Sequence, residues 1–246
     1  MSRKPGIQRP APAHAAGQGT WLRHAVVALG AAAVGWMFYR SRMEWDPEMR
    51  TWRAVGDAAL VLLLLATTAG PVARLWPKAK AVLLWRRALG VWACLAALLH
   101  AYLVWDGWAR WSLRGLLGYE DLPGVPEPVL TQPGFGLANI LGAAALAWMV
   151  VLLAVSSDRA IAWLGSSGWT RLQQGIRVVF HLVVLHAGYF LFLHYDLGLR
   201  MLAMGRGPPP PDWFRWPFAI LVALALLLNA AAFAKTVRAR RMGTVQ

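Results

Sequence analysis

The sequence predicts an all-α integral membrane protein, a six-helix bundle with both termini in the cytoplasm, and three observations lead to this prediction. Of its 246 residues 58% are apolar and only 15% are charged, whereas an ordinary soluble domain carries about 25% charged residues. Six stretches are long and apolar enough to cross a bilayer, and the basic residues gather between alternate stretches. Together these observations exclude an ordinary soluble domain.

The six spans follow from length and composition. A helix that crosses about 30 Å of hydrocarbon needs roughly 20 mostly apolar residues. The stretches that meet this requirement are 24–39, 54–73, 86–105, 135–155, 173–194 and 214–234. The first is short and rich in Gly and Ala, so it could be the core of a cleaved signal peptide. Because its apolar run continues through Trp36, Met37 and Phe38, we favour a retained helix.

The distribution of charge orients these spans. Sixteen of the 25 Lys and Arg residues fall in the segments placed inside, and ten of the eleven acids fall outside. Cytoplasmic loops are enriched in Lys and Arg, so the segments with more of these residues are placed in the cytoplasm together with both termini. We therefore expect a multi-pass protein of the bacterial inner (cytoplasmic) membrane. The net charge of +14 is then an orientation signal, so we expect contact with membrane lipid and no nucleic-acid partner. The predicted organisation is a disordered basic tail at 1–22, the bundle at 23–236 and a basic cytoplasmic tail at 237–246.

The chain has one cysteine, Cys94. A single thiol excludes an internal disulfide, a multi-thiolate zinc or iron–sulfur site and the two-cysteine attachment motif of c-type haem. A redox metal in this chain would therefore have to be held by histidine.

Histidines inside the spans are the main candidates for a functional site, because an ionisable group at membrane depth is costly. His100 lies about 21 Å along the third span and His186 about 20 Å along the fifth, at 1.5 Å per residue, and both spans run in the same direction. Two neutral imidazoles at one depth can bind the two faces of a b-type haem. The alternative, a histidine hydrogen-bonded across a helix interface, stays open for both. His181 is roughly 140° round the helix from His186, and Leu95, at its depth on the third span, offers no ligand.

Three stretches resemble a known family. Residues 86–100 (RRALGVWACLAALLH) resemble the Arg-Arg-x-Leu-Gly to Leu-His signature of ferric-reductase-like transmembrane domains. Residues 168–186 resemble the Trp-x-Arg-Leu-His to Leu-His segment of that family, and 62–71 (LLLLATTAGP) resembles its apolar run ending in Thr and Pro. The resemblance covers residues 52–195 and is greatest to the haem-binding membrane subunit of the bacterial periplasmic methionine-sulfoxide reductase (MsrQ/YedZ).

This resemblance implies one haem b with His100 and His186 as its axial ligands. Relatives with a second haem carry a further histidine where this chain has Gln173, and Arg86 stands at the matching depth of the third span. Neither is a usual haem ligand. In the family, electrons pass from the quinol pool or a flavin reductase to a periplasmic molybdenum-containing reductase. We therefore expect a membrane electron-transfer subunit with a quinol or flavin-reductase donor and a periplasmic redox partner protein.

Two axial histidines leave iron no open position, so the sequence predicts no catalytic residue. The chain has no Gly-rich dinucleotide fingerprint in a strand–helix setting, so a bound flavin is not supported, whereas quinone is a second candidate cofactor. Further cofactor-binding candidates are His181 and, as outer-side partners for haem propionates, His194, Arg110 and Arg114.

Two other functions remain open from the sequence. Direct reduction of a metal ion at the outer face would use the acidic loop with Glu120, Asp121 and Glu127 to gather cations. A non-redox scaffold or transporter is the other alternative, although matching positions of the two halves hold no pair of helices broken by Gly or Pro, as in many transporters.

Overall fold

The computed structural model describes residues 13–122, 124–131, 134–194 and 212–243. It confirms the predicted all-α six-helix membrane bundle, because this part of the chain has six helices long and apolar enough to cross a membrane. They are α1 (Ala13–Arg40), α2 (Pro47–Leu75), α3 (Arg86–Leu103) with its π-helical turn η2 (Val104–Trp108), α5 (Phe135–Ala154), α7 (Ile176–Gly188) with its π-helical turn η3 (Tyr189–Leu193), and α9 (Arg215–Arg241). The fifth candidate span begins at Asp158, so it also includes the helix that precedes α7.

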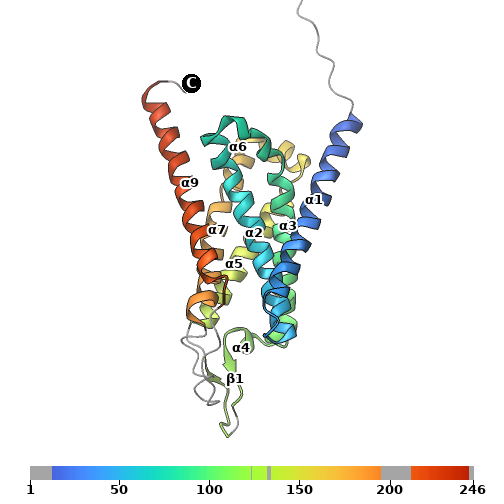
Figure 1. Ribbon diagram of the computed structural model, residues 1–246, viewed down its shortest axis with the longest axis vertical. Helices are drawn as coiled ribbons and strands as arrows, with labels where there is room; N and C mark the ends of the chain where they lie inside the picture. The colour runs from blue at the N-terminus through green and yellow to red at the C-terminus, as the bar shows by residue number, and fades with distance from the viewer. Residues whose placement is uncertain (1–12, 123, 132–133, 195–211, 244–246) are drawn as a thin grey trace, which may run out of the picture.

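Shorter elements connect these helices at the two ends of the bundle. A 3-10 helix, η1 (Pro77–Leu84), joins α2 to α3, and α6 (Asp158–Gln173) precedes α7. The opposite end carries a small lobe, made of α4 (Leu113–Leu116) and the antiparallel strands β1 (Tyr119–Glu120) and β2 (Val129–Leu130). We call it the outer lobe, after the side on which the sequence predicts it. The start of α1 and the end of α9 both lie at the end away from this lobe, on opposite sides of the bundle (Figure 1). This arrangement fits an even number of spans with both ends on one side.

Helix α2 is the centre of the bundle and packs against α1, α3, α7 and α9. Its most apolar window is 56% buried, against at most 28% in the other five spans. Alanines at 54, 58, 59, 66 and 69 keep its surface narrow, so that neighbouring helices approach closely. Asp46 caps its start by accepting hydrogen bonds from the backbone N–H groups of Glu48 and Met49.

The observed helices are longer than the predicted spans at several ends. Helix α2 begins at Pro47 rather than at residue 54, because the charged residues of its first turns find partners in the structure. Helix α1 begins within the predicted tail at 1–22, and residues 1–12 of that tail lie outside the described residues. Helix α9 continues into the predicted tail at 237–246 as far as Arg241.

A buried apolar cluster lies between the level of His100 and His186 and the end of the bundle away from the small lobe. It joins α2, α3, α5 and α7 through Leu62, Cys94, Met149 and Val179 among others. Cys94 is 1% exposed there, so the one thiol is part of the packed core.

Candidate functional site

The two histidines predicted from their depth lie together in the structure. His100 on α3 and His186 on α7 have ring centres 6.4 Å apart, with ring planes at 75°. Two helices that are far apart in sequence therefore bring their imidazoles together within the bundle.

Each ring is held by a backbone carbonyl of a neighbouring helix. His100 Nδ1 lies 2.8 Å from the carbonyl oxygen of Trp52 on α2. His186 Nδ1 lies 2.7 Å from the carbonyl oxygen of Ala138 on α5. Because a carbonyl only accepts, Nδ1 carries the proton in both rings, and each neutral imidazole keeps the lone pair of Nε2 for a ligand bond. A second-shell carbonyl of this kind is how metal-binding histidines are usually oriented.

The spacing of the rings fits two imidazoles that share one metal ion. A metal–nitrogen bond to imidazole is about 2 Å, and the ring centre lies roughly 1 Å beyond the nitrogen, so the two centres should be about 6 Å apart. The observed 6.4 Å agrees with this value. Among the described residues, no group of three or more His, Cys, Asp or Glu side chains is arranged to hold a metal. Two imidazoles at this spacing are a donor set that would suit a bis-histidine haem.

An aromatic layer covers the pair on the side of the outer lobe. Phe190 lies 5.0 Å from His186 and 5.2 Å from His194, measured between ring centres. Phe135 joins this group to Trp108 at 5.6 Å, and Trp108 lies 6.4 Å from Trp52. These rings place aromatic surface between the histidine pair and the outer lobe.

The other predicted cofactor-binding residues lie in different surroundings. His194 is 8% exposed and belongs to the aromatic layer, with Phe135 at 5.4 Å. His181 is exposed, and its Nδ1 donates to the carbonyl of Arg177 on its own helix, 2.7 Å away. Arg110 and Arg114 are exposed at the start of the outer lobe. The structure therefore brings His100, His186 and, one layer further out, His194 together, and it leaves His181 on the outside of α7.

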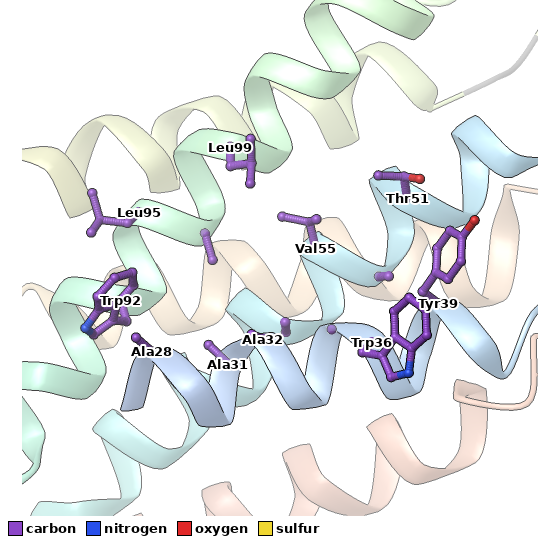
Figure 2. A pocket seen from close by; sticks show the side chains of 14 residues that line it. Ala28, Ala31, Ala32, Trp36, Tyr39, Thr51, Val55, Trp92, Leu95 and Leu99 are labelled. Carbon is purple, nitrogen blue, oxygen red and sulfur yellow. The ribbon is translucent and has the colours of Figure 1, made fainter. Parts of the chain in front are cut away.

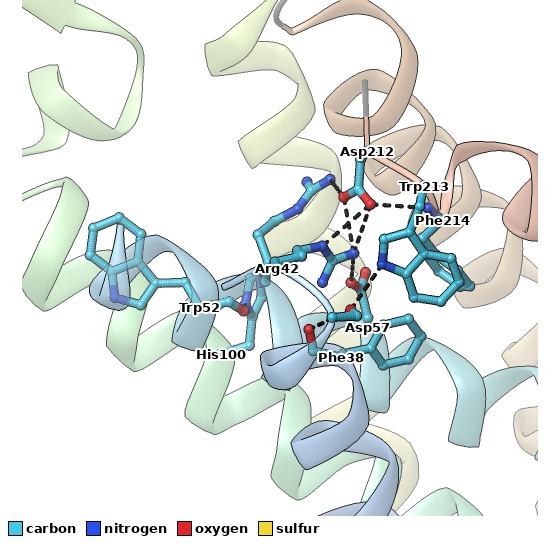
Figure 3. Close-up of polar contacts among 10 residues, drawn as sticks. Phe38, Arg42, Trp52, Asp57, His100, Asp212, Trp213 and Phe214 are labelled. Carbon is cyan, nitrogen blue, oxygen red and sulfur yellow. Dashed lines mark hydrogen bonds and ion pairs between the residues drawn. The ribbon is translucent and has the colours of Figure 1, made fainter. Parts of the chain in front are cut away.

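A buried ionic cluster lies beside the site, and the sequence analysis missed it. It consists of Arg42, Arg53, Asp57 and Asp212, of which Figure 3 labels Arg42, Asp57 and Asp212. Arg42 Nη2 lies 2.6 Å from Asp57 Oδ2 and 2.9 Å from Asp212 Oδ2, and Arg53 Nη2 lies 3.0 Å from the latter atom. Arg53 directly follows Trp52, so the cluster fixes the turn of α2 whose carbonyl holds His100. The i, i+4 spacing of Arg53 and Asp57 was a signal for part of this cluster.

Asp212 is ionised because of its two arginines. Burial by itself would raise the pKa of this carboxyl group, but Arg53 and Arg42 lower it by more, and the backbone N–H of Phe214 lowers it further. The net result is a pKa below the usual value.

A groove of about 640 Å³ lies between α1, α2 and α3 (Figure 2). Small apolar residues of α1 and α2 line it, together with Trp92 and Leu99 of α3. The hydroxyls at its outer end are engaged elsewhere, since Thr51 donates to the carbonyl of Pro47 and Tyr39 accepts from Arg50. We therefore describe it as an apolar recess and assign it no ligand.

Comparison with models of known protein families finds none that matches this chain, and comparison with curated proteins finds no match.

Proposed function

We propose that this chain is a membrane electron-transfer protein that binds one b-type haem through His100 and His186. The observation that carries the proposal is the pair of imidazoles with centres 6.4 Å apart, each oriented by a carbonyl bond at Nδ1. A haem bound there supplies a one-electron couple within the bilayer.

The residues around the pair suit this role. The carbonyls of Trp52 and Ala138 fix the tautomer and orientation of the two rings and make Nε2 a better donor. A haem held by both His100 and His186 would have no open position for a substrate, which supports electron transfer over chemistry at the metal. The aromatic layer supplies apolar surface next to the pair, which suits a haem.

The direction of transfer is part of the proposal. The resemblance to ferric-reductase-like domains supports a quinol or flavin-reductase donor and a periplasmic redox partner as acceptor. The excess of basic residues in the loops at the end away from the lobe supports placing that end in the cytoplasm of a bacterium. The outer lobe then faces the periplasm, where the acceptor would bind.

Optical spectroscopy of the purified full-length chain tests the proposal. The wild type should show a Soret band and, after reduction with dithionite, a b-type α band. His100→Ala and His186→Ala should each abolish both bands, whereas His181→Ala should keep them. The pyridine haemochrome assay should give one haem per chain, and a value near two would contradict the single-haem assignment.

A non-redox scaffold is the second candidate, and the same two hydrogen bonds favour it, since histidine can serve as a link between helices. A folded wild type without a Soret band would support this candidate and overturn the first.

A further inference from the structure

The two halves of the site are two copies of one arrangement. In the first half His100 bonds to the carbonyl of the residue 48 positions earlier, Trp52. In the second half His186 bonds to the carbonyl of Ala138, also 48 positions earlier. The helix pairs α2/α3 and α5/α7 therefore present their histidines in the same register.

The correspondence extends along both helices at one constant offset in residue number. Gly-x-Ala-Ala-Leu occurs at 56–60 and 142–146, and Leu-His-Ala occurs at 99–101 and 185–187. A π-helical turn follows each histidine helix, as η2 and η3. At the same offset Trp108 corresponds to His194, and both rings pack on Phe135, at 5.6 and 5.4 Å.

A glycine backs each histidine ring. A Cβ atom on Gly56 would lie 3.0 Å from Cε1 and from Nδ1 of His100. A Cβ atom on Gly142 would lie 2.7 Å from Nδ1 and 2.8 Å from Cε1 of His186. Each glycine is four residues after the carbonyl that binds the ring, so carbonyl and glycine lie on one face of the helix, one turn apart. Each imidazole ring therefore packs directly against the backbone of one helical turn, at a position where glycine has no side chain.

We propose that Gly56 and Gly142 are positioning residues for the histidine pair. Because each glycine lacks a Cβ, the backbone of its helix approaches the imidazole closely enough for the carbonyl to accept a hydrogen bond from Nδ1–H. Nε2 of each ring is then left to bind the group that the two histidines share. The inference rests on the proposed function in one respect, because the group that the two Nε2 atoms would share is the proposed haem.

The test compares Gly56→Ala and Gly142→Ala with two matched controls in the same histidine helices. Gly90 on α3 has nothing within 4 Å of its Cβ position, and Gly188 on α7 has only Phe218 at 4.0 Å. In the haem-loaded protein we expect Gly142→Ala to lose most of the low-spin bis-histidine electron-paramagnetic-resonance signal and Gly56→Ala to shift it, with a changed midpoint potential in both. Gly90→Ala and Gly188→Ala should keep the wild-type signal and potential.

A double-mutant cycle provides a readout that needs no haem. Gly56→Ala should lower the thermal unfolding temperature in the wild-type background and should no longer do so beside His100→Ala, because the ring that it displaces is gone. Gly142→Ala and His186→Ala should behave in the same way.

The outcomes separate the two proposals. Coupling in both cycles with no haem in the wild type would overturn the proposed function and leave glycine and ring in contact as inferred. Haem binding with no coupling, and with both glycine variants indistinguishable from their controls, would overturn the inference and leave the proposed function standing.

Discussion

The two halves of the site share one backbone arrangement but are fixed by different chemistry. In the first half the residue after the carbonyl is Arg53 and the residue after the glycine is Asp57, and both belong to the buried ionic cluster. In the second half the corresponding residues are Asn139 and Ala143. Asn139 donates from Nδ2 to the carbonyl of Leu116 in the outer lobe, 2.7 Å away.

This difference shows that a histidine of the pair can be held with or without an ionic cluster beside it. Charges are tolerated in the first half because each carboxylate meets an arginine within 3 Å, as a buried ion requires. The second half reaches the same geometry with one amide hydrogen bond and a layer of aromatic rings. The first half should therefore respond more strongly than the second to the loss of a carboxylate and to the acidic range in which carboxylates titrate.

The largest effect should follow from Asp212→Asn. This change removes the carboxylate that the buried Arg42 shares with the partly buried Arg53, and breaking a buried ion pair costs about 3–5 kcal/mol of unfolding free energy. Thermal or denaturant unfolding of the full chain in detergent measures the loss. Asp158→Asn is the control, because its pair with Arg87 has side chains that are 87% and 50% exposed, and exposed pairs contribute about 1 kcal/mol or less. Equal stability of the two variants would mean that the cluster does not stabilise the first half.

A smaller effect should follow from Asn139→Ala in the second half. The variant leaves the carbonyl of Leu116 without its donor at the base of the outer lobe, which costs about 1–3 kcal/mol. Asn229→Ala is the matched control, because Asn229 donates to a carbonyl within its own helix, that of Ala225. The prediction fails if both asparagine variants unfold alike.

The dependence on pH should separate the halves further. The pKa of Asp212 is lower in the folded protein than its usual value of 3.8. The stability that the carboxylate contributes is therefore fully present above this value and is lost as the pH falls through the lower, folded pKa. Unfolding of the wild type and of Asp212→Asn, compared over this acidic range, should show a difference that shrinks as the pH falls. Asn139→Ala should keep the pH dependence of the wild type, and a constant difference between wild type and Asp212→Asn would exclude Asp212 as the titrating group.

The level of each histidine along its helix could be predicted from the sequence. The contacts that depend on how the helices are rotated and packed could not. The rise per residue is fixed in a helix, so counting from Arg86 and Gln173 placed His100 and His186 at one level. The pair Arg42–Asp212 joins residues 170 positions apart, and only the packing of α9 beside α2 brings them together. The repeat of Gly-x-Ala-Ala-Leu at 56–60 and 142–146 is present in the sequence, but the contact of Gly56 and Gly142 with the histidine rings is apparent only once the packing of the helices is known. Part of the loop before α9, with its prolines at 208–211, lies outside the described residues.

The smallest effect should come from His181, and the repeat explains why. At the constant offset between the halves, His181 corresponds to Leu95 on α3, which is 40% exposed, and His181 is exposed as well. The position therefore faces away from the histidine pair in both halves. His181→Leu should change the unfolding free energy by about 0.5 kcal/mol or less and should leave haem content and the α band as in the wild type. His194→Leu is the comparison, because His194 is buried. A loss of haem in His181→Leu would contradict the correspondence between His181 and Leu95, since it would mean that the second half binds the cofactor through a position that the first half leaves exposed.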